Sequence, residues 1–181
     1  MPLHREETVE LVRYIFSIQN EDGGWGLHIA GESTPFGSVS HYVALRLLGI
    51  SPVDPRLQKA WSCQREMGGV LHSPLLVKFW LAILGVIPWG IVAPLLPDLW
   101  LLPDWVPIAP WRWWVYPRAI YAPFSFIWSR KWSYPRREKD QLILDIRNEL
   151  LGHYSLEIQS IWSRFRTAVG PQDDFILSRG S

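Results

Sequence analysis

The chain has 181 residues, of which 48% are hydrophobic and 19% charged, and its formal net charge is +1. This length suffices for one domain with its own hydrophobic core, and the near-zero charge gives no footprint for nucleic acid. Cys63 is the only cysteine, which excludes an internal disulfide and a cysteine-based zinc site.

The first half of the chain predicts four helices. Leu11, Ile15 and Ile18 recur at the spacing of one helical face and predict a helix over residues 5–18. Turn-forming residues 19–24 end it. A second helix is predicted with an N-cap at Ser33 or Thr34, Pro35 in the first turn, a face of Val39, Val43 and Leu47, and an end at Gly49. A third helix is predicted from Asp54-Pro55 through Gln64, ended by Gly68-Gly69. A fourth is predicted from Pro74 through Val86.

The last third also reads as helical. Apolar residues form one helical stripe at Leu142, Ile143, Ile146 and Leu150, and a second stripe at Ile158, Ile161, Trp162 and Phe165. No segment alternates with the period of two that strands show. The sequence therefore predicts an all-α fold.

The middle of the chain has the composition of a membrane surface. Residues 79–97 carry no charge and approach the length of a membrane span, but glycines and prolines interrupt them, so a single straight span is not expected. Residues 98–132 then mix tryptophans and prolines with Arg112, Arg118, Arg130 and Lys131. Apolar side chains, interfacial tryptophans and cations together favour one-sided membrane attachment. The alternative is a proline-rich region packed against a large protein core.

Several motifs in order resemble one family. Tyr14-Ile15, Gln19 and Gly23-Gly24-Trp25 match the repeated Gln–Trp motif of the terpene cyclases, in the oxidosqualene cyclase (lanosterol synthase-like) branch. The resemblance continues through Gly68-Gly69, Lys78-Phe79-Trp80-Leu81-Ala82, "LLPDWVP" at residues 101–107, and Tyr121 with Pro123, and it covers the chain to about Leu151. The basic and small residues that open the family's motif do not occur upstream.

The resemblance implies a fold and a location. These enzymes consist of two α/α barrels, and residues 1–151 resemble part of the smaller, inserted barrel, with residues 152–181 as a divergent helical tail. The fold expected is thus a partial α/α (toroidal) barrel with a Pro/Trp-rich segment facing the membrane. The family is monotopic and takes squalene or 2,3-oxidosqualene from the bilayer through a channel. Residues 88–121 resemble the mouth of that channel. An intracellular membrane, the endoplasmic reticulum or a lipid droplet, is expected by the same resemblance.

The resemblance also assigns roles to residues. Tyr121 matches a channel tyrosine, and Tyr116-Pro117 stands where sterol-forming members carry a His-Cys pair, while Leu76 falls on a cavity-lining tryptophan. Gln19, Gly23, Gly24 and Trp25 would brace one helix against the next. The tryptophans expected to face the membrane are Trp100, Trp105, Trp111, Trp113 and Trp114. No metal and no cofactor are expected, since His28, His41 and His72 lack ligand spacing.

The catalytic acid of the family is not found in this sequence. Cyclisation begins when a carboxylic acid protonates the epoxide or alkene, and aromatic rings then stabilise the migrating cation. Neither the Asp-Cys-Thr-Ala-Glu motif nor the Asp-x-Asp-Asp-Thr-Ala motif occurs. The Asp173-Asp174 pair, Asp98 and Asp104 are interpreted as turn or capping carboxylates.

Two functions of different classes therefore remain open. The first is a triterpene or sterol cyclase-family protein, shortened and inactive alone, that either is a fragment of a longer gene product or pairs with a chain carrying the catalytic barrel. The second is a non-catalytic, membrane-associated remnant or partner subunit. A prenyltransferase β-subunit, with a related barrel, is disfavoured because its zinc ligands have no counterpart here.

Overall fold

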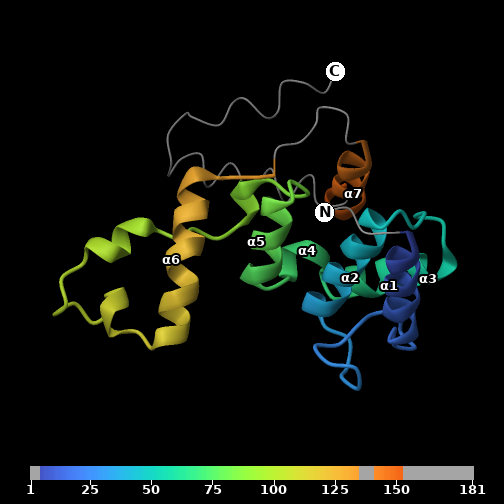
Figure 1. The fold of residues 1–181 in the computed structure, drawn as a ribbon, viewed down its shortest axis with the longest axis horizontal. Helices are drawn as coiled ribbons and strands as arrows, with labels where there is room; N and C mark the ends of the chain where they lie inside the picture. The colour runs from blue at the N-terminus through green and yellow to red at the C-terminus, as the bar shows by residue number, and fades with distance from the viewer. Residues whose placement is uncertain (1–4, 135–140, 153–181) are drawn as a thin grey trace.

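The computed structural model describes residues 5–134 and 141–152, and within these ranges every regular element is a helix (Figure 1). The all-α prediction is confirmed. The elements are the α-helices α1 (Arg5–Ser17), α2 (Pro35–Leu47), α3 (Pro55–Glu66), α4 (Gly69–His72), α5 (Leu75–Ile83), α6 (Val115–Arg130) and α7 (Gln141–Leu151), and the 3-10 helices η1 (Trp89–Ile91), η2 (Pro97–Leu101) and η3 (Pro110–Arg112). The predicted tail, with its stripe from Ile158 to Phe165, lies outside the described residues.

The predicted starts of α2 and α3 are confirmed, with their capping chemistry. Thr34 precedes α2 and its hydroxyl accepts a hydrogen bond from the Gly37 N–H at 3.1 Å, with Pro35 in the first turn. Asp54 precedes α3 and its carboxylate accepts from the Arg56 N–H at 2.9 Å. Each cap satisfies an N–H that has no partner within its helix.

Two predicted helical faces need correction at single positions. In α1, Ile15 is buried but Leu11 is 39% exposed, and Val12 and Phe16 pack against the core instead. In α2 the inward face runs through Val39, Val43 and Arg46, whereas the predicted Leu47 is 38% exposed. The inner face of α2 therefore contains a charged residue, Arg46, which a search for apolar residues alone does not find.

The fourth predicted helix is shorter than expected. It was expected to run from Pro74 through Val86, but α5 ends at Ile83. Gly85 adopts a φ of +75°, and the Val86 and Ile87 N–H groups turn back to the Leu81 carbonyl at 2.9 and 3.3 Å. This glycine turn closes the helix before the apolar run ends.

Helix α6 was not predicted. It runs from Val115 to Arg130 through a segment rich in prolines and tryptophans, with Pro123 inside it. Proline lacks the N–H that a helix interior uses, so its presence argued against a helix here. Figure 1 shows the 3-10 helices η2 and η3 projecting beside α6, on the side away from α1, α2 and α3.

Helix α2 lies at the centre of the core. Val39, Tyr42, Val43 and Leu45 are buried, and α3, α4, α5 and α7 all pack against α2. The core continues through Leu57 and Ala60 of α3 and through Val77, Phe79, Leu81 and Ala82 of α5. This packing places α7 beside α2, although the two helices lie far apart in sequence.

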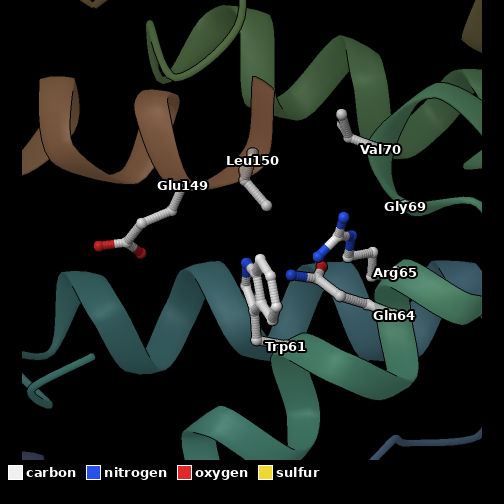
Figure 2. Close-up of a pocket in the computed structure, with 7 residues that line it drawn as sticks. All are labelled: Trp61, Gln64, Arg65, Gly69, Val70, Glu149 and Leu150. Atoms are coloured by element: carbon white, nitrogen blue, oxygen red, sulfur yellow. The ribbon is translucent and has the colours of Figure 1, made fainter. Parts of the chain in front are cut away.

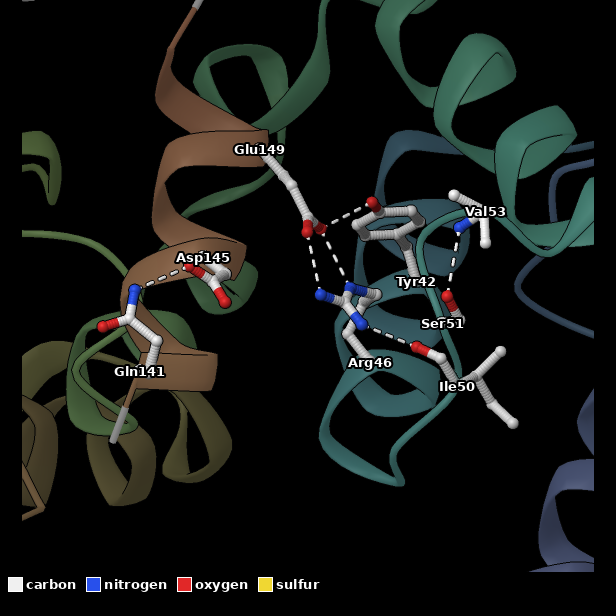
Figure 3. Close-up of polar contacts among 8 residues, drawn as sticks. All are labelled: Tyr42, Arg46, Ile50, Ser51, Val53, Gln141, Asp145 and Glu149. Carbon is white, nitrogen blue, oxygen red and sulfur yellow. Dashed lines mark hydrogen bonds and ion pairs between the residues drawn. The ribbon is translucent and has the colours of Figure 1, made fainter. Parts of the chain in front are cut away.

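A charged network joins α7 to α2 (Figure 3). The Glu149 carboxylate accepts hydrogen bonds from the Tyr42 hydroxyl at 2.8 Å and from Arg46 Nε and Nη2 at 3.0 and 2.8 Å. Arg46 Nη1 also donates to the Ile50 carbonyl at 2.6 Å. Burial, followed by the bond to Glu149, raises the pKa of Tyr42, and the bond to Glu149 is the main cause that raises the pKa of Arg46.

Candidate functional site

The glycine and tryptophan motif at residues 19–25 connects three helices. Trp25 is 1% exposed; its indole N–H donates to the Ile15 carbonyl of α1 at 2.9 Å, and its backbone N–H donates to Ser38 Oγ of α2 at 3.1 Å. Gln19 Nε2 donates to the Gly23 carbonyl at 2.7 Å and to the Arg56 carbonyl of α3 at 3.1 Å. One loop therefore fixes α1, α2 and α3 relative to one another.

The glycines of this motif are required by space and backbone conformation. Gly23 has a φ of +94°, and a Cβ there would lie 2.6 Å from the Lys59 side chain. A Cβ on Gly24 would lie 2.6 Å from the hydroxyl oxygens of Ser33 and Ser38. A side chain at either position would disturb the bonds that the loop makes.

A second region, which we call the aromatic lobe, comprises residues 96–121. Tyr121 lies at its centre, donating its hydroxyl to the Leu96 carbonyl at 2.8 Å. Its ring meets Trp113 edge to face at 5.0 Å and lies 6.3 Å from Trp100, which in turn meets Trp111 edge to face at 5.2 Å. Burial raises the pKa of Tyr121, so its hydroxyl stays protonated as the donor.

The five tryptophans predicted to face a membrane divide into two groups. Trp105, Trp111 and Trp114 are 77%, 50% and 71% exposed. Trp100 and Trp113 are half-buried, and their indole N–H groups donate to Ser125 Oγ at 3.4 Å and to the Ile108 carbonyl at 3.1 Å. Leu101 and Ile108 of the same segment are likewise 82% and 62% exposed. The lobe thus has a ring cluster at its centre, and its outer surface carries exposed apolar side chains together with the exposed Asp98, Asp104 and Arg112.

The predicted channel residues do not converge. Tyr121 joins the ring cluster, but Tyr116 is 63% exposed and packs edge to face on Trp114 at 4.8 Å. Pro117 is exposed in the first turn of α6. Leu76, predicted to line a cavity, lies on α5 and is 38% exposed, one turn from Trp80. Of these four residues, only Tyr121 has ring contacts with Trp100 and Trp113.

The aromatic contacts extend from α6 to α5. Phe124 stacks on Phe79 at 4.0 Å and meets Trp80 edge to face at 6.2 Å, and Phe79 meets Trp89 edge to face at 5.3 Å. Lys78, beside them, donates to the Leu71 carbonyl at 2.6 Å, and its burial lowers its pKa. These contacts hold α6, and with it the lobe, against the core.

Neither a metal centre nor a membrane span is found in the described ranges. No group of three or more His, Cys, Asp or Glu side chains there is arranged to hold a metal ion. His41 and His72 each place Nδ1 near the carbonyl four residues earlier, at 2.8 and 2.9 Å. No helix of residues 5–134 and 141–152 is long and apolar enough to cross a bilayer. Asp173 and Asp174 lie outside these residues.

Comparison with known proteins gives the family. Residues 1–168 match the sequence model of the squalene-hopene cyclase N-terminal domain. Lanosterol synthase erg7A of Aspergillus fumigatus is 44% identical over 176 residues, which are 96% of this chain and 23% of that protein. The lanosterol synthase of Mus musculus is 42% identical over 165 residues, which are 91% of this chain and 22% of that protein. The fold and these matches define a helical triterpene cyclase domain.

The chain belongs to the terpene cyclase/mutase family, in its oxidosqualene cyclase branch. It spans less than a quarter of the length of these two curated relatives. The all-helical structure agrees with an α/α barrel, of which these helices would form one part.

Reasoning from sequence missed three polar features of this structure. The first is the Arg46–Glu149 ion pair. The other two are Gln64 Oε1 and the Trp128 indole N–H, each of which is buried without a hydrogen-bond partner among the described residues. One signal was available for the first, because Arg46 stands seven residues after Val39 on the inner face of α2. No local signal marks the other two.

Proposed function

We propose that this chain forms the membrane-facing, substrate-admitting part of a sterol or triterpene cyclase that acts on 2,3-oxidosqualene or squalene. The observation that carries the proposal is the aromatic lobe, which combines the exposed Trp105 and Leu101 side chains with a ring cluster centred on Tyr121. The relatives' name, lanosterol synthase, supports the assignment to sterol biosynthesis. The substrate would enter from the lipid beside this lobe.

The chemistry of the lobe suits a hydrocarbon. Edge-to-face rings around Tyr121 offer π-faces and few polar atoms, and a long polyene loses no hydrogen bonds when it leaves the lipid for such a surface. The Tyr121 hydroxyl is already used in the bond to the Leu96 carbonyl. In this proposal Tyr121 therefore positions η2 and shapes the entrance, and it is not an acid that starts cyclisation.

We further propose that the chain does not cyclise substrate by itself. The reaction needs a carboxylic acid aimed at the epoxide, and the 181 residues contain neither acid motif of the family. The catalytic barrel, whether it belongs to the same longer polypeptide or to another chain, would supply that acid. The second candidate is a non-catalytic, membrane-associated remnant or partner subunit. It would have the same lobe, but it would take no part in cyclisation.

Incubation of the purified chain with 2,3-oxidosqualene in detergent tests this proposal. We expect no tetracyclic or pentacyclic product by gas chromatography, and product formation by the chain alone would contradict the proposed division of labour. Addition of a lanosterol synthase fragment that carries the acid motif but lacks this region separates the two candidates. Restored cyclisation supports the cyclase role, whereas unchanged inactivity favours the remnant.

The location follows from the same proposal. Attachment to one face of an intracellular membrane, the endoplasmic reticulum or a lipid droplet, would bring the lobe to the substrate. The supporting observations are the exposed Trp105, Trp114 and Leu101 side chains and the nearby Arg112 and Arg118. Fluorescent tagging of the chain in cells, with markers for both compartments, would report it.

A further inference from the structure

Charge is unevenly distributed along the chain. Residues 105–134 carry four cations, Arg112, Arg118, Arg130 and Lys131, and no aspartate or glutamate. The whole chain has a formal net charge of +1, so removing these four cations from the count leaves −3 for the other residues. Two of the four cations are consecutive, and they lie where α6 ends. The near-zero total therefore does not reveal a basic surface at one end of this helix.

We call this surface the basic end of α6, and it comprises Phe126, Arg130, Lys131, Trp132 and Tyr134. The two cations are exposed, and the three aromatic side chains are 58%, 50% and 60% exposed in chain order. The Arg130 guanidinium carbon lies 4.8 Å from the centre of the Phe126 ring, so a cation is held over an aromatic face. Cations and exposed aromatic rings therefore occur together here, outside the aromatic lobe.

The segment that follows α6 is fixed to α5. Ser133 Oγ donates to the Ala82 carbonyl at 2.8 Å and accepts from the Trp89 indole N–H at 2.9 Å. The Tyr134 N–H donates to the carbonyl of the last residue of α5 at 2.7 Å. Because Ser133 is turned toward the core, Trp132 and Tyr134 on either side of it are held at the surface.

Lys131 occupies a backbone position that favours glycine. Its φ is +46°, and no other non-glycine residue of the described ranges has a positive φ. Its N–H donates to the Trp128 carbonyl at 3.0 Å, and the Trp132 N–H donates to the Ile127 carbonyl at 3.3 Å, the two bonds that close a helix through a left-handed residue. Glycine adopts this conformation with less strain than lysine does. The turn alone therefore favours glycine, and what lysine adds is a cation.

The helix end does not cancel the charge of these cations. The C-terminus of a helix carries about −0.5 elementary charge, and here the Ile127 and Trp128 carbonyls already accept hydrogen bonds. Two full positive charges outweigh that partial charge, so the surface attracts anions. The helix end explains why cations are favoured at this place, but it does not explain three exposed aromatic rings.

We propose that the basic end of α6 binds the phosphate groups of anionic phospholipids at a membrane surface. Arg130 and Lys131 would pair with the phosphates, and Trp132 and Tyr134 would lie at headgroup depth, where aromatic rings with one polar atom are favoured. This inference rests on the membrane attachment proposed above and adds the class of lipid. An acidic polymer in solution would satisfy the cations, but it would give the rings no apolar boundary.

Flotation over a series of lipid concentrations measures how the chain partitions into phosphatidylcholine vesicles with and without phosphatidylserine. We expect phosphatidylserine to tighten binding at least about thirty-fold, as two cations at an anionic surface allow, and sodium chloride to remove most of that gain. Equal binding to both kinds of vesicle would overturn this inference and leave the role of the aromatic lobe intact. A chain that floats with neither would contradict the attachment itself. Complete displacement by soluble polyglutamate would assign the surface to an acidic protein and overturn the inference as well.

Two variants remove the cations one at a time. Lys131→Gly removes a charge and favours the left-handed turn, so a folding defect would not account for weaker binding. We expect Lys131→Gly and Arg130→Gln each to weaken binding to phosphatidylserine-containing vesicles about five-fold, and the double variant about thirty-fold. Binding to pure phosphatidylcholine should stay unchanged. A double variant that keeps the preference for phosphatidylserine would refute the assignment to these residues.

Arg65→Gln is the matched control. Arg65 is also exposed and also lies over an aromatic ring, 5.0 Å from the centre of Trp61, but it belongs to α3. Figure 2 shows it beside a small hollow that Glu149 also lines and that has free space for about one water molecule. We expect this variant to bind both kinds of vesicle like the parent chain. A loss equal to that of Arg130→Gln would show that total charge governs binding, and it would overturn the inference.

Discussion

Removal of the Glu149 carboxylate should release α7 from the core. In Glu149→Ala, the Arg46 guanidinium, whose side chain is 6% exposed, loses two hydrogen bonds and its counter-charge, and the Tyr42 hydroxyl loses its acceptor. Breaking a buried ion pair by deleting one partner costs about 3–5 kcal/mol. Glu149 is 20% exposed, which moderates the penalty, so we expect a loss near the lower limit, about 3 kcal/mol.

Urea unfolding followed by far-ultraviolet circular dichroism measures this loss as a lower midpoint with an unchanged slope. Glu149→Gln keeps an acceptor oxygen and should lose less than Glu149→Ala. Asn148→Ala, an exposed change on the same helix, should stay within about 0.5 kcal/mol of the parent chain. A cost below about 1 kcal/mol for Glu149→Ala, the level of an exposed ion pair, would refute the claim that this network holds α7.

Three further predictions follow from single residues. The raised pKa of Tyr42 means that the folded chain keeps a proton that the unfolded chain releases, so the free energy of unfolding should fall as pH rises above about 10, and Tyr42→Phe should flatten that fall. Burial and the nearby Asp22 raise the pKa of the Cys63 thiol to about 11, so iodoacetamide at neutral pH should label the folded chain far more slowly than the urea-unfolded chain; equal rates would contradict the buried thiol. Trp25→Phe removes the indole bond to the Ile15 carbonyl and should cost about 2 kcal/mol or more in urea unfolding, from the lost volume and the unpaired carbonyl together, whereas an unchanged midpoint would show that the loop does not brace α1.

The sequence signals that correctly predicted the ends of helices are those that act directly on the nearby backbone. Thr34 and Asp54 begin helices because their oxygens accept from N–H groups of the first turn, and Gly68, with a φ of +86°, follows α3 where the sequence placed its end. Such signals act over a few residues and can be read from the chain. The motif at residues 19–25 was readable for the same reason, although its contacts with α3 were not.

The features that sequence did not predict depend on packing between distant segments. Helix α6 forms despite Pro123 because Phe124 stacks on Phe79 and Tyr121 is tied to Leu96, contacts that compensate for the missing N–H. The Arg46–Glu149 pair joins residues more than 100 positions apart, and neither residue alone signals the other. The positions of the candidate channel residues likewise follow from how α6 forms and packs. Tyr116 and Tyr121 are five residues apart on α6 and therefore lie on different faces of the helix.

The central claim, that the aromatic lobe enters a membrane, is tested most directly by flotation with phosphatidylcholine vesicles. We expect the chain to float with the lipid, and the double substitution Leu101→Asp and Trp105→Asp to reduce the floated fraction at least about ten-fold, since each removes a largely exposed apolar side chain. Leu27→Asp, a control at a 70% exposed leucine in the loop between α1 and α2, should float like the parent chain. A parent chain that stays at the bottom of the gradient with or without lipid, or a double variant that floats equally well, would contradict the account.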